Sequence, residues 1–268
     1  MITSLSNPKV KHLVELQSKS RTRNKEGLFV IEGIKMFLEA SCNLIKEVYV
    51  DEITYKKMEE CQKATPSTNL GEAYLKLVRL KSEGVFVETV STDVFKKASD
   101  TQTPQGILAV IGMMNYCLKD ILGGNVLVLE DIQDPGNLGT MIRTAEGAGV
   151  SGVLMSKGTV DIFNPKTIRS TMGSLFRVPF YYTDDLKTSI DELKKAGIKV
   201  YAAHLKGTEF YDEIKYEGKS AFLIGNEGNG LSDETAGLAD MYIKIPMEGK
   251  LESLNASIAA ALLMYRAR

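Results

Sequence analysis

The sequence predicts an α/β protein in two parts: a C-terminal, mostly parallel sheet with helices on both faces, and a smaller N-terminal α/β domain. Short β-rich runs alternate with helical patterns from residue 27, and the alternation is most regular beyond residue 123. The stretch 113–122 has no clear period and ends in Gly-Gly-Asn, which predicts a hinge. The predicted division is a basic arm over 1–24, a small domain over 25–112, a linker over 113–122 and a larger domain over 123–268.

In the small domain, runs rich in β-branched residues are separated by short helical patterns. Strands are expected at 28–31, 47–50, 85–90 and 107–111, and helices at 34–40, 55–64 and 93–98.

In the larger domain, strands are expected at 126–129, 152–155, 178–182, 199–203, 221–224 and 241–245, and helices at 140–148, 165–172, 184–196 and 253–266. Strands that alternate with helices favour a parallel sheet. Ligands of such sheets bind where the loops leave the carboxyl ends of the strands, so these loops are the place to look for chemistry.

The composition is that of an ordinary globular protein, with 44% hydrophobic and 25% charged residues among 268. Cys42, Cys61 and Cys117 show no disulfide or zinc spacing, and neither His12 nor His204 stands in a metal-ligand pattern. No apolar run is long enough to span a bilayer. We therefore expect a cytoplasmic protein with no metal and no membrane partner.

The net charge of −1 gives no global attraction for nucleic acid, so an RNA partner needs a local patch. One basic run stands in the first 25 residues, where Glu15 is the single acid before residue 26. Its members are Lys9, Lys11, Lys19, Arg21, Arg23 and Lys25. They are candidates for phosphate contact. A solvated helix face is the equally simple alternative.

Three loops of the larger domain carry candidate reactive residues. In the first, Pro135 and Gly136 predict a turn, Asn137 is a candidate helix cap, and Arg143 falls in the first two turns of the next helix. If Asn137 stays in the loop, its amide and the Arg143 guanidinium can converge. A cap and a surface arginine are the plainer alternative.

The second loop places three glycines around Glu227, directly after an apolar strand. Such glycines allow a ligand to approach the backbone closely, whereas a plain turn with a solvated carboxylate is the alternative. The loop fits neither the dinucleotide fingerprint nor the P-loop. The third loop passes Pro246 and leads to Ser253, a candidate helix cap whose neighbouring N–H groups could serve a ligand.

Together these loops resemble the signature of the SpoU/TrmH-type ribose methyltransferases of the SPOUT superfamily. The resemblance covers residues 123–266 and lies in the segments 137–143 (NLGTMIR), 224–228 (IGNEG), and 245–247 (IPM) with 253–257 (SLNAS). Upstream, 29–33 (FVIEG) and 103–109 (TPQGILA) resemble the start and end of the RNA substrate-binding domain of many members, which is similar to the L30e fold.

The resemblance implies a deep trefoil knot, S-adenosylmethionine as cofactor, and a homodimer with active sites at its interface. It implies cofactor contacts around Leu205, Gly225, Ile245, Met247 and Leu254. It places Asn137, Arg143, Glu227, Ser253 and Asn255 at the reaction centre.

Methyl transfer from a sulfonium needs alignment more than covalent help. Because a guanidinium stays protonated, Arg143 is expected to stabilise developing negative charge on the ribose oxygen and to bind the adjacent phosphate, not to act as a base. The proton could pass to Glu227, to phosphate or to water.

The separate N-terminal domain and the basic arm favour ribosomal RNA as the substrate, where structured single-stranded loops offer accessible riboses, with transfer RNA as the alternative. A non-catalytic RNA-binding protein of the same fold is a second alternative, against which Arg143, Glu227 and Asn255 argue. A nicotinamide-dependent dehydrogenase would need a glycine fingerprint after residues 126–129, and the sequence 134–139 (DPGNLG) does not supply it.

Overall fold

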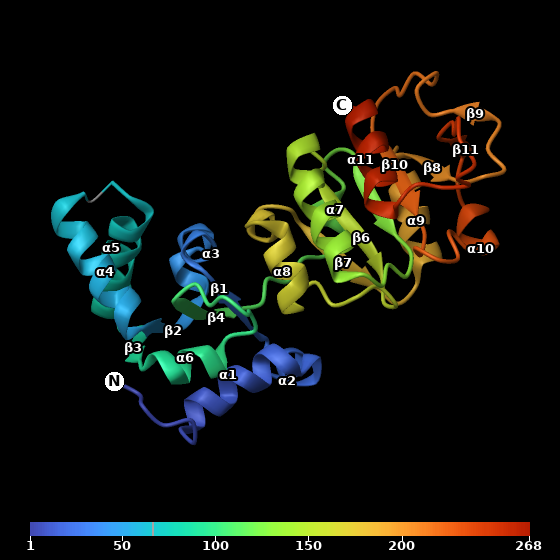
Figure 1. The fold of residues 1–268 in the computed structure, drawn as a ribbon. Helices are drawn as coiled ribbons and strands as arrows, with labels where there is room; N and C mark the ends of the chain where they lie inside the picture. The colour runs from blue at the N-terminus through green and yellow to red at the C-terminus, as the bar shows by residue number, and fades with distance from the viewer. Residues whose placement is uncertain (66) are drawn as a thin grey trace. The chain divides into compact units, whose positions relative to one another are not determined.

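The computed structural model describes residues 1–65 and 67–268, which form two compact units (Figure 1). Unit 1 comprises Met1–Met114 and Phe163–Phe176, and unit 2 comprises Asn115–Ile162 and Arg177–Arg268. Unit 1 thus contains a segment from the C-terminal half of the chain, which the sequence analysis assigned to the larger domain.

Unit 1 is built on a four-stranded mixed sheet, ordered β1 (Leu28–Glu32), β4 (Ile107–Gly112), β2 (Ile45–Asp51), β3 (Phe86–Val90). Strand β4 runs antiparallel to β1 and β2, whereas β2 and β3 are parallel. The carboxyl ends of β1, β2 and β3 therefore share one edge with the amino end of β4.

The helices of unit 1 are α1 (Pro8–Ser18), α2 (Ser20–Glu26), α3 (Ile34–Glu39), α4 (Glu52–Ala64), α5 (Asn69–Ser82), α6 (Thr92–Ala98) and α8 (Pro165–Thr171), with a 3-10 turn, η1 (Cys42–Leu44).

Residues 1–24 are not a separate arm, because α1 is part of the core of unit 1. Its buried side chains Val10, Leu13 and Leu16 recur every three residues and pack in one cluster with Phe95 of α6. Arg23, in α2, is also buried and donates to the carbonyl oxygen of Leu16 at 2.8 Å.

Helix α5 was not expected from the sequence, although its signal is present. Thr68 caps it by accepting from the Gly71 N–H, and Ala73, Leu77 and Leu80 bury one helical face. Its Lys76 donates to the carbonyl oxygen of Phe37 at 2.7 Å and so ties α5 to α3.

Unit 2 contains a seven-stranded sheet, and every pairing in it is parallel, which confirms the expected sheet. The strand order is β7 (Phe180–Thr183), β6 (Gly152–Ser156), β5 (Val126–Leu129), β10 (Ser220–Ile224), β8 (Lys199–Ala203), β11 (Met241–Lys244), β9 (Glu209–Phe210). The short edge strand β9 was not expected. Because β5 and β10 are neighbours, the loops that follow them leave the same edge of the sheet side by side.

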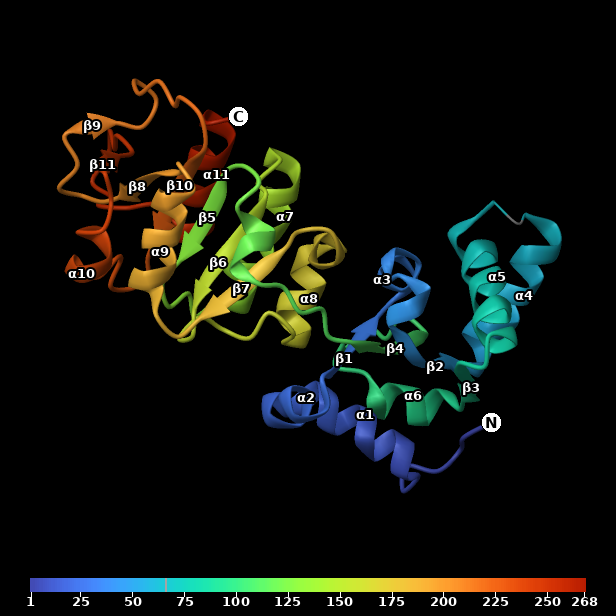
Figure 2. The same cartoon turned by 180° about the vertical axis from the view of Figure 1, so that it is seen from behind.

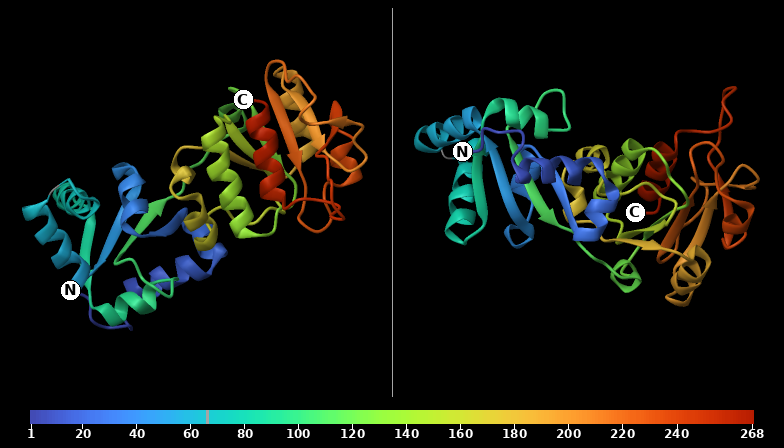
Figure 3. Two further views of the ribbon diagram at one scale, coloured as in Figure 1. Left: turned by 45° about the horizontal axis from the view of Figure 1, so that its top comes forward. Right: turned by 90° about the horizontal axis from the view of Figure 1, so that it is seen from below.

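Helices cover both faces of this sheet. Helices α7 (Pro135–Ala148) and α11 (Ala256–Arg266) lie side by side on one face (Figures 1 and 3), and α9 (Leu186–Lys195) lies on the other (Figure 2). The remaining elements are α10 (Asp233–Ala236) and two 3-10 turns, η2 (Leu118–Ile121) in unit 2 and η3 (Ser174–Phe176) in unit 1. Val126 and Val128 of β5 share a buried cluster with Ile190 and Leu193 of α9, as the period-two alternation of a strand requires.

Two helices begin elsewhere than expected, and both differences involve candidate site residues. Helix α7 begins at Pro135 and is capped by Asp134, which accepts from the Asn137 N–H, so Asn137 lies inside the first turn. Helix α11 begins at Ala256 and is capped by Asn255, whereas Ser253 was the expected cap. Among residues 1–65 and 67–268, no helix is long and apolar enough to cross a membrane.

Candidate active site

Four neighbouring strands of unit 2 deliver the three candidate loops to one edge. In the order β5, β10, β8 and β11, the strands end at Leu129, Ile224, Ala203 and Lys244. Parallel strands end at a common edge, so the candidate loops after β5, β10 and β11 all begin at this edge, and the loop after β8, which contains Leu205, begins there too.

Glu227 links the loop after β10 to the loop after β5. Its Oε1 accepts from the Asp134 N–H and from the Asn137 side-chain amide, both at 3.0 Å, and its Oε2 accepts from the Gln133 N–H at 3.0 Å. Partial burial opposes ionisation, but these hydrogen bonds outweigh it and hold the pKa of Glu227 below its ordinary value of 4.5. The carboxylate therefore stays ionised at neutral pH.

Asn255 brings the third loop to the same point. Its Nδ2 donates to Asn137 Oδ1 at 3.0 Å, while its Oδ1 accepts from the backbone N–H and the hydroxyl of Ser257. A continuous chain of hydrogen bonds thus runs from Asn255 through Asn137 to Glu227. One residue from each of the three candidate loops takes part in it.

A second carboxylate, Glu130, joins the same two loops from the other side: it follows β5 and accepts hydrogen bonds from residues that follow β10. Its Oε2 accepts from the Ser232 N–H at 2.8 Å, and its Oε1 accepts from the Ser232 hydroxyl at 2.7 Å and from the Thr235 hydroxyl. Glu130 was not among the residues predicted for the site. The available signal was its place directly after a buried strand, at the edge where ligands bind.

The glycine loop between Ile224 and Ser232 is a closed turn. Asn226 and Gly230 form an isolated bridge, and Asn226 Oδ1 accepts from the N–H of Gly228 at 2.9 Å. A β-carbon on Gly225 would lie 2.1 Å from backbone atoms of Gly230 and Leu231. Glycine at 225 is therefore required for the turn to close.

Arg143 and Ser253 are not part of the hydrogen-bond chain. Both side chains are exposed, and neither makes a hydrogen bond or ion pair with any residue that the structure describes. Arg143 lies on α7, beyond Asn137, and its five donors are open to a ligand.

The five residues expected at the cofactor follow three adjacent strands. Leu205 follows β8, Gly225 follows β10, and Ile245, Met247 and Leu254 stand between β11 and α11. Leu205 is 60% exposed, an apolar side chain with little cover. Apolar surface beside irregular backbone fits a nucleoside, whose base needs apolar contact and whose edges need backbone partners.

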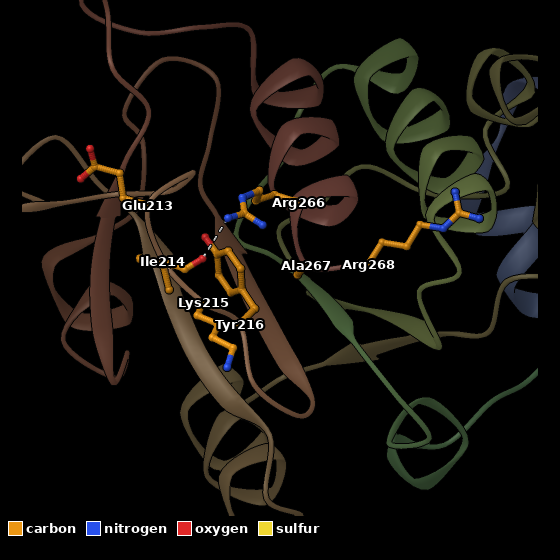
Figure 4. A pocket seen from close by; sticks show the side chains of 7 residues that line it. All are labelled: Glu213, Ile214, Lys215, Tyr216, Arg266, Ala267 and Arg268. Atoms are coloured by element: carbon orange, nitrogen blue, oxygen red, sulfur yellow. Dashed lines mark hydrogen bonds between the residues drawn. The ribbon is translucent and has the colours of Figure 1, made fainter.

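A pocket of unit 2 lies at the other edge of its sheet (Figure 4). It is lined by Glu213, Ile214, Lys215, Tyr216, Arg266, Ala267 and Arg268. These residues precede the amino end of β10 or end α11, and Asn125, just before β5, donates to the carbonyl oxygen of Ala267. The pocket is therefore separate from the three loops.

The structure divides the six basic residues predicted to bind RNA. Lys9 pairs with Glu47 at 2.7 Å, Lys19 pairs with Glu15 at 2.8 Å, and Arg23 is buried. Lys11, Arg21 and Lys25 are exposed. Within the described ranges, no three His, Cys, Asp or Glu side chains gather as metal ligands would.

Comparisons with known proteins find relatives along the whole chain. Residues 124–265 match the SpoU rRNA Methylase family, and residues 7–109 match the MRM3-like substrate binding domain. The 23S rRNA (guanosine(2553)-2′-O)-methyltransferase RlmP of Bacillus subtilis is 36% identical over 272 residues, covering 100% of this chain and 98% of that protein. An uncharacterized tRNA/rRNA methyltransferase of Synechocystis is 31% identical, covering 100% and 93%.

A solved structure that is described as bound to AdoMet has the same fold. The AdoMet-bound rRNA methyltransferase from Sinorhizobium meliloti superimposes with a TM-score of 0.84 at 32% identity, covering 100% of this chain and 96% of that one.

Proposed function

The chain belongs to the SpoU rRNA Methylase family, and from this premise we propose that its three loops methylate a ribose 2′-hydroxyl of ribosomal RNA. It is an RNA methyltransferase that depends on S-adenosylmethionine. The observation that carries the assignment of the site is the hydrogen-bond chain from Asn255 through Asn137 to Glu227, which joins all three loops at one edge of the sheet.

The cofactor supplies a methyl group on a sulfonium, which makes the departing thioether a good leaving group. The cofactor-side residues are Leu205, Gly225, Ile245, Met247 and Leu254, which would bind the nucleoside through apolar and backbone contacts. The exposed Arg143 would bind the phosphate next to the target ribose and would stabilise the negative charge that develops on the 2′-oxygen as its proton leaves.

Glu227 acts as a clamp and not as the proton acceptor. Three hydrogen bonds occupy its two oxygens, and its lowered pKa makes it a weaker base than an ordinary carboxylate. The hydroxyl proton therefore passes to the neighbouring phosphate or to water. Ser253, exposed beside the cap of α11, orients the ribose.

Ribosomal RNA is favoured over transfer RNA by full-length relatives that are named for it. The distribution of charge favours unit 1 as the RNA-binding part: it holds 18 Lys and Arg against 14 Asp and Glu, whereas unit 2 holds 15 against 20. The proposed place of action is the cytoplasm, where bacterial ribosomes are assembled.

We also infer a homodimer, formed on the outer face of α7 and α11. Ile258 and Tyr265 of α11 are 51% and 50% exposed and stand seven residues apart, on one face. A β-carbon on Gly147 of α7 would lie 2.8 Å from the Tyr265 hydroxyl, so this face adjoins the helix that carries Arg143. A partner there would enclose the exposed guanidinium.

We also propose that the backbone of unit 2 forms a trefoil knot. Strand β11 lies two places beyond β10 in the sheet, yet the chain returns from it to pack α11 against α7 and β10. At the end of that return, Asn255 donates to Asn137, which in turn donates to Glu227 of the glycine loop, and this proximity is consistent with threading of the C-terminal segment.

Transfer of radiolabelled methyl from S-adenosylmethionine to purified RNA tests the function. Protein-free 23S rRNA should gain label, and alkaline hydrolysis should leave it in resistant dinucleotides, since a 2′-O-methyl group blocks cleavage of the adjoining bond. Label in transfer RNA alone would overturn the choice of substrate. Cofactor binding by calorimetry without transfer to any RNA would favour the non-catalytic alternative.

A further inference from the structure

The connection between α6 and β4 in unit 1 is an irregular loop, residues 99–106, whose base is closed by one buried carboxylate. Glu32, 9% exposed at the end of β1, accepts from the hydroxyls of Ser99 and Thr101 and, at 3.1 Å, from the Gln105 N–H. Both ends of the loop therefore converge on the same side chain, which fixes its shape without a contact at its tip.

The tip of this loop offers hydrogen-bonding groups that have no partner in the protein. Gln102, Thr103 and Gln105 are exposed, and their side chains make no hydrogen bond with any described residue. A β-carbon on Gly33, which has a φ of 103°, would lie 2.1 Å from Gln105 Oε1, so the Gln105 amide lies directly over the start of α3.

Three lysines flank the tip. Lys35 stands two residues after Gly33, and Lys96 and Lys97 form the last turn of α6. All three are exposed, and none forms an ion pair with another described residue. Among the acids near them, Asp100 pairs with Arg169 at 2.7 Å, Asp93 lies in the first turn of α6, and Glu39 lies one turn after Lys35 on α3.

The basic run at the N-terminus differs in part: Lys9, Lys19 and Arg23 are committed to contacts within the protein, and the other three cations of that run are exposed. Charges that are already paired give little affinity for an external anion, whereas free lysines around an uncommitted polar loop can bind one.

We propose that residues 99–106, with Lys35, Lys96 and Lys97, form a binding site for unpaired nucleotides of the RNA substrate. The lysines bind phosphates, and the amides of Gln102 and Gln105 hydrogen-bond to exposed Watson–Crick edges, which a duplex would hide. The site rests on the proposed function, because it recognises the RNA that unit 2 methylates.

Two sets of variants test the site, each compared with the wild-type full chain. The loop variant combines Gln102→Ala, Thr103→Ala and Gln105→Ala, and the cation variant combines Lys35→Gln, Lys96→Gln and Lys97→Gln. The matched control combines Lys46→Gln and Lys81→Gln, exposed lysines of unit 1 near the opposite edge of its sheet. All leave Glu32 and Arg143 intact.

The loop variant should raise KM for protein-free 23S rRNA about tenfold or more, the effect of losing one well-made polar contact. Its kcat and its Kd for S-adenosylmethionine should stay near wild type. The cation variant should weaken binding of a labelled single-stranded RNA 12-mer. The negative slope of log K against log salt should become less steep by about 0.7 per lost phosphate contact. The control should change neither quantity.

If the loop variant had the KM of the wild type, the proposed site would be wrong. An equal weakening of RNA binding in the control variant would also contradict it. So would tighter binding of the wild type to the duplexed 12-mer than to the single-stranded one. Failure of the proposed function is a separate outcome, because there the wild type itself would transfer no methyl group to rRNA. Unchanged circular dichroism and melting temperature establish that each variant is folded.

Discussion

Glu130 and Glu227 fasten each other's loops. Glu130 follows β5 and holds Ser232, beyond β10, whereas Glu227 follows β10 and holds Asn137, beyond β5. Each of the two loops therefore provides one carboxylate that accepts hydrogen bonds from the other loop, and these contacts fix the distance between the loops. The candidate site is thereby organised before any ligand binds, which lowers the cost of ordering it during catalysis.

Arg143→Ala should lower kcat for methyl transfer by at least about a hundredfold, the cost of removing one preorganised electrostatic contact to the reacting oxygen. The Kd for S-adenosylmethionine should stay within about threefold, because Arg143 makes no contact that shapes the loops. Thr140→Ala, an exposed change one turn earlier on α7, is the control. If Arg143→Ala transferred methyl groups at the wild-type rate, Arg143 would not be the residue that stabilises the reacting oxygen.

Asn137→Ala should destabilise unit 2 by about 1–3 kcal/mol in urea unfolding, because Glu227 loses a donor and Asn255 loses an acceptor. Asn137→Asp should cost more, since it places a second carboxylate against Glu227. If the aspartate variant were as stable as wild type, the hydrogen-bond chain would not be a stabilising element.

Glu130→Gln should weaken binding of S-adenosylmethionine about tenfold, with kcat at saturating cofactor largely retained. Glutamine keeps the size of the side chain but turns one acceptor into a donor, which then faces the Ser232 N–H. Calorimetry gives the Kd, and Glu234→Gln, a nearby acid for which we find no hydrogen-bond or ion-pair partner among the described residues, is the control. An equal loss of affinity for S-adenosylmethionine in both variants would show that net charge matters, and not the hydrogen bonds of Glu130 to Ser232.

The lowered pKa of Glu227 predicts a loss of stability in acid. Because the folded pKa lies below the ordinary value of 4.5, the clamp stabilises the protein above that pH and is lost as the pH falls through the folded value. Glu227→Gln should therefore melt at a lower temperature than wild type near pH 6, and the difference should shrink below about pH 4. A difference that is constant with pH would contradict the assignment.

The sequence predicted the architecture of unit 2 well because apolar strands at regular spacing define a parallel sheet. It misplaced the start of α7 because Asp134 and Asn137 are both good caps, and only the structure shows that Asp134 accepts from the Asn137 N–H. The same competition between two caps places the cap of α11 at Asn255 instead of Ser253.

Contacts distant in sequence could not be predicted. Glu130 and Ser232 are about a hundred residues apart, and nothing in either local sequence pairs them. The charge run at the N-terminus was visible, but charge alone did not show that Lys9 pairs with Glu47 or that Arg23 is buried. The grouping of 163–176 with unit 1 likewise depends on tertiary packing, including the ring contact of Phe163 with Phe29.

The central claim is that these three loops methylate a ribose of ribosomal RNA with Arg143 at the reacting oxygen. The most direct test maps 2′-O-methylation across rRNA from cells that lack the protein, complemented with either the wild type or Arg143→Ala. We predict that at least one ribose of rRNA is methylated with the wild type and unmodified with Arg143→Ala at equal protein level. Identical methylation maps in the two strains, or a difference confined to transfer RNA, would contradict the account.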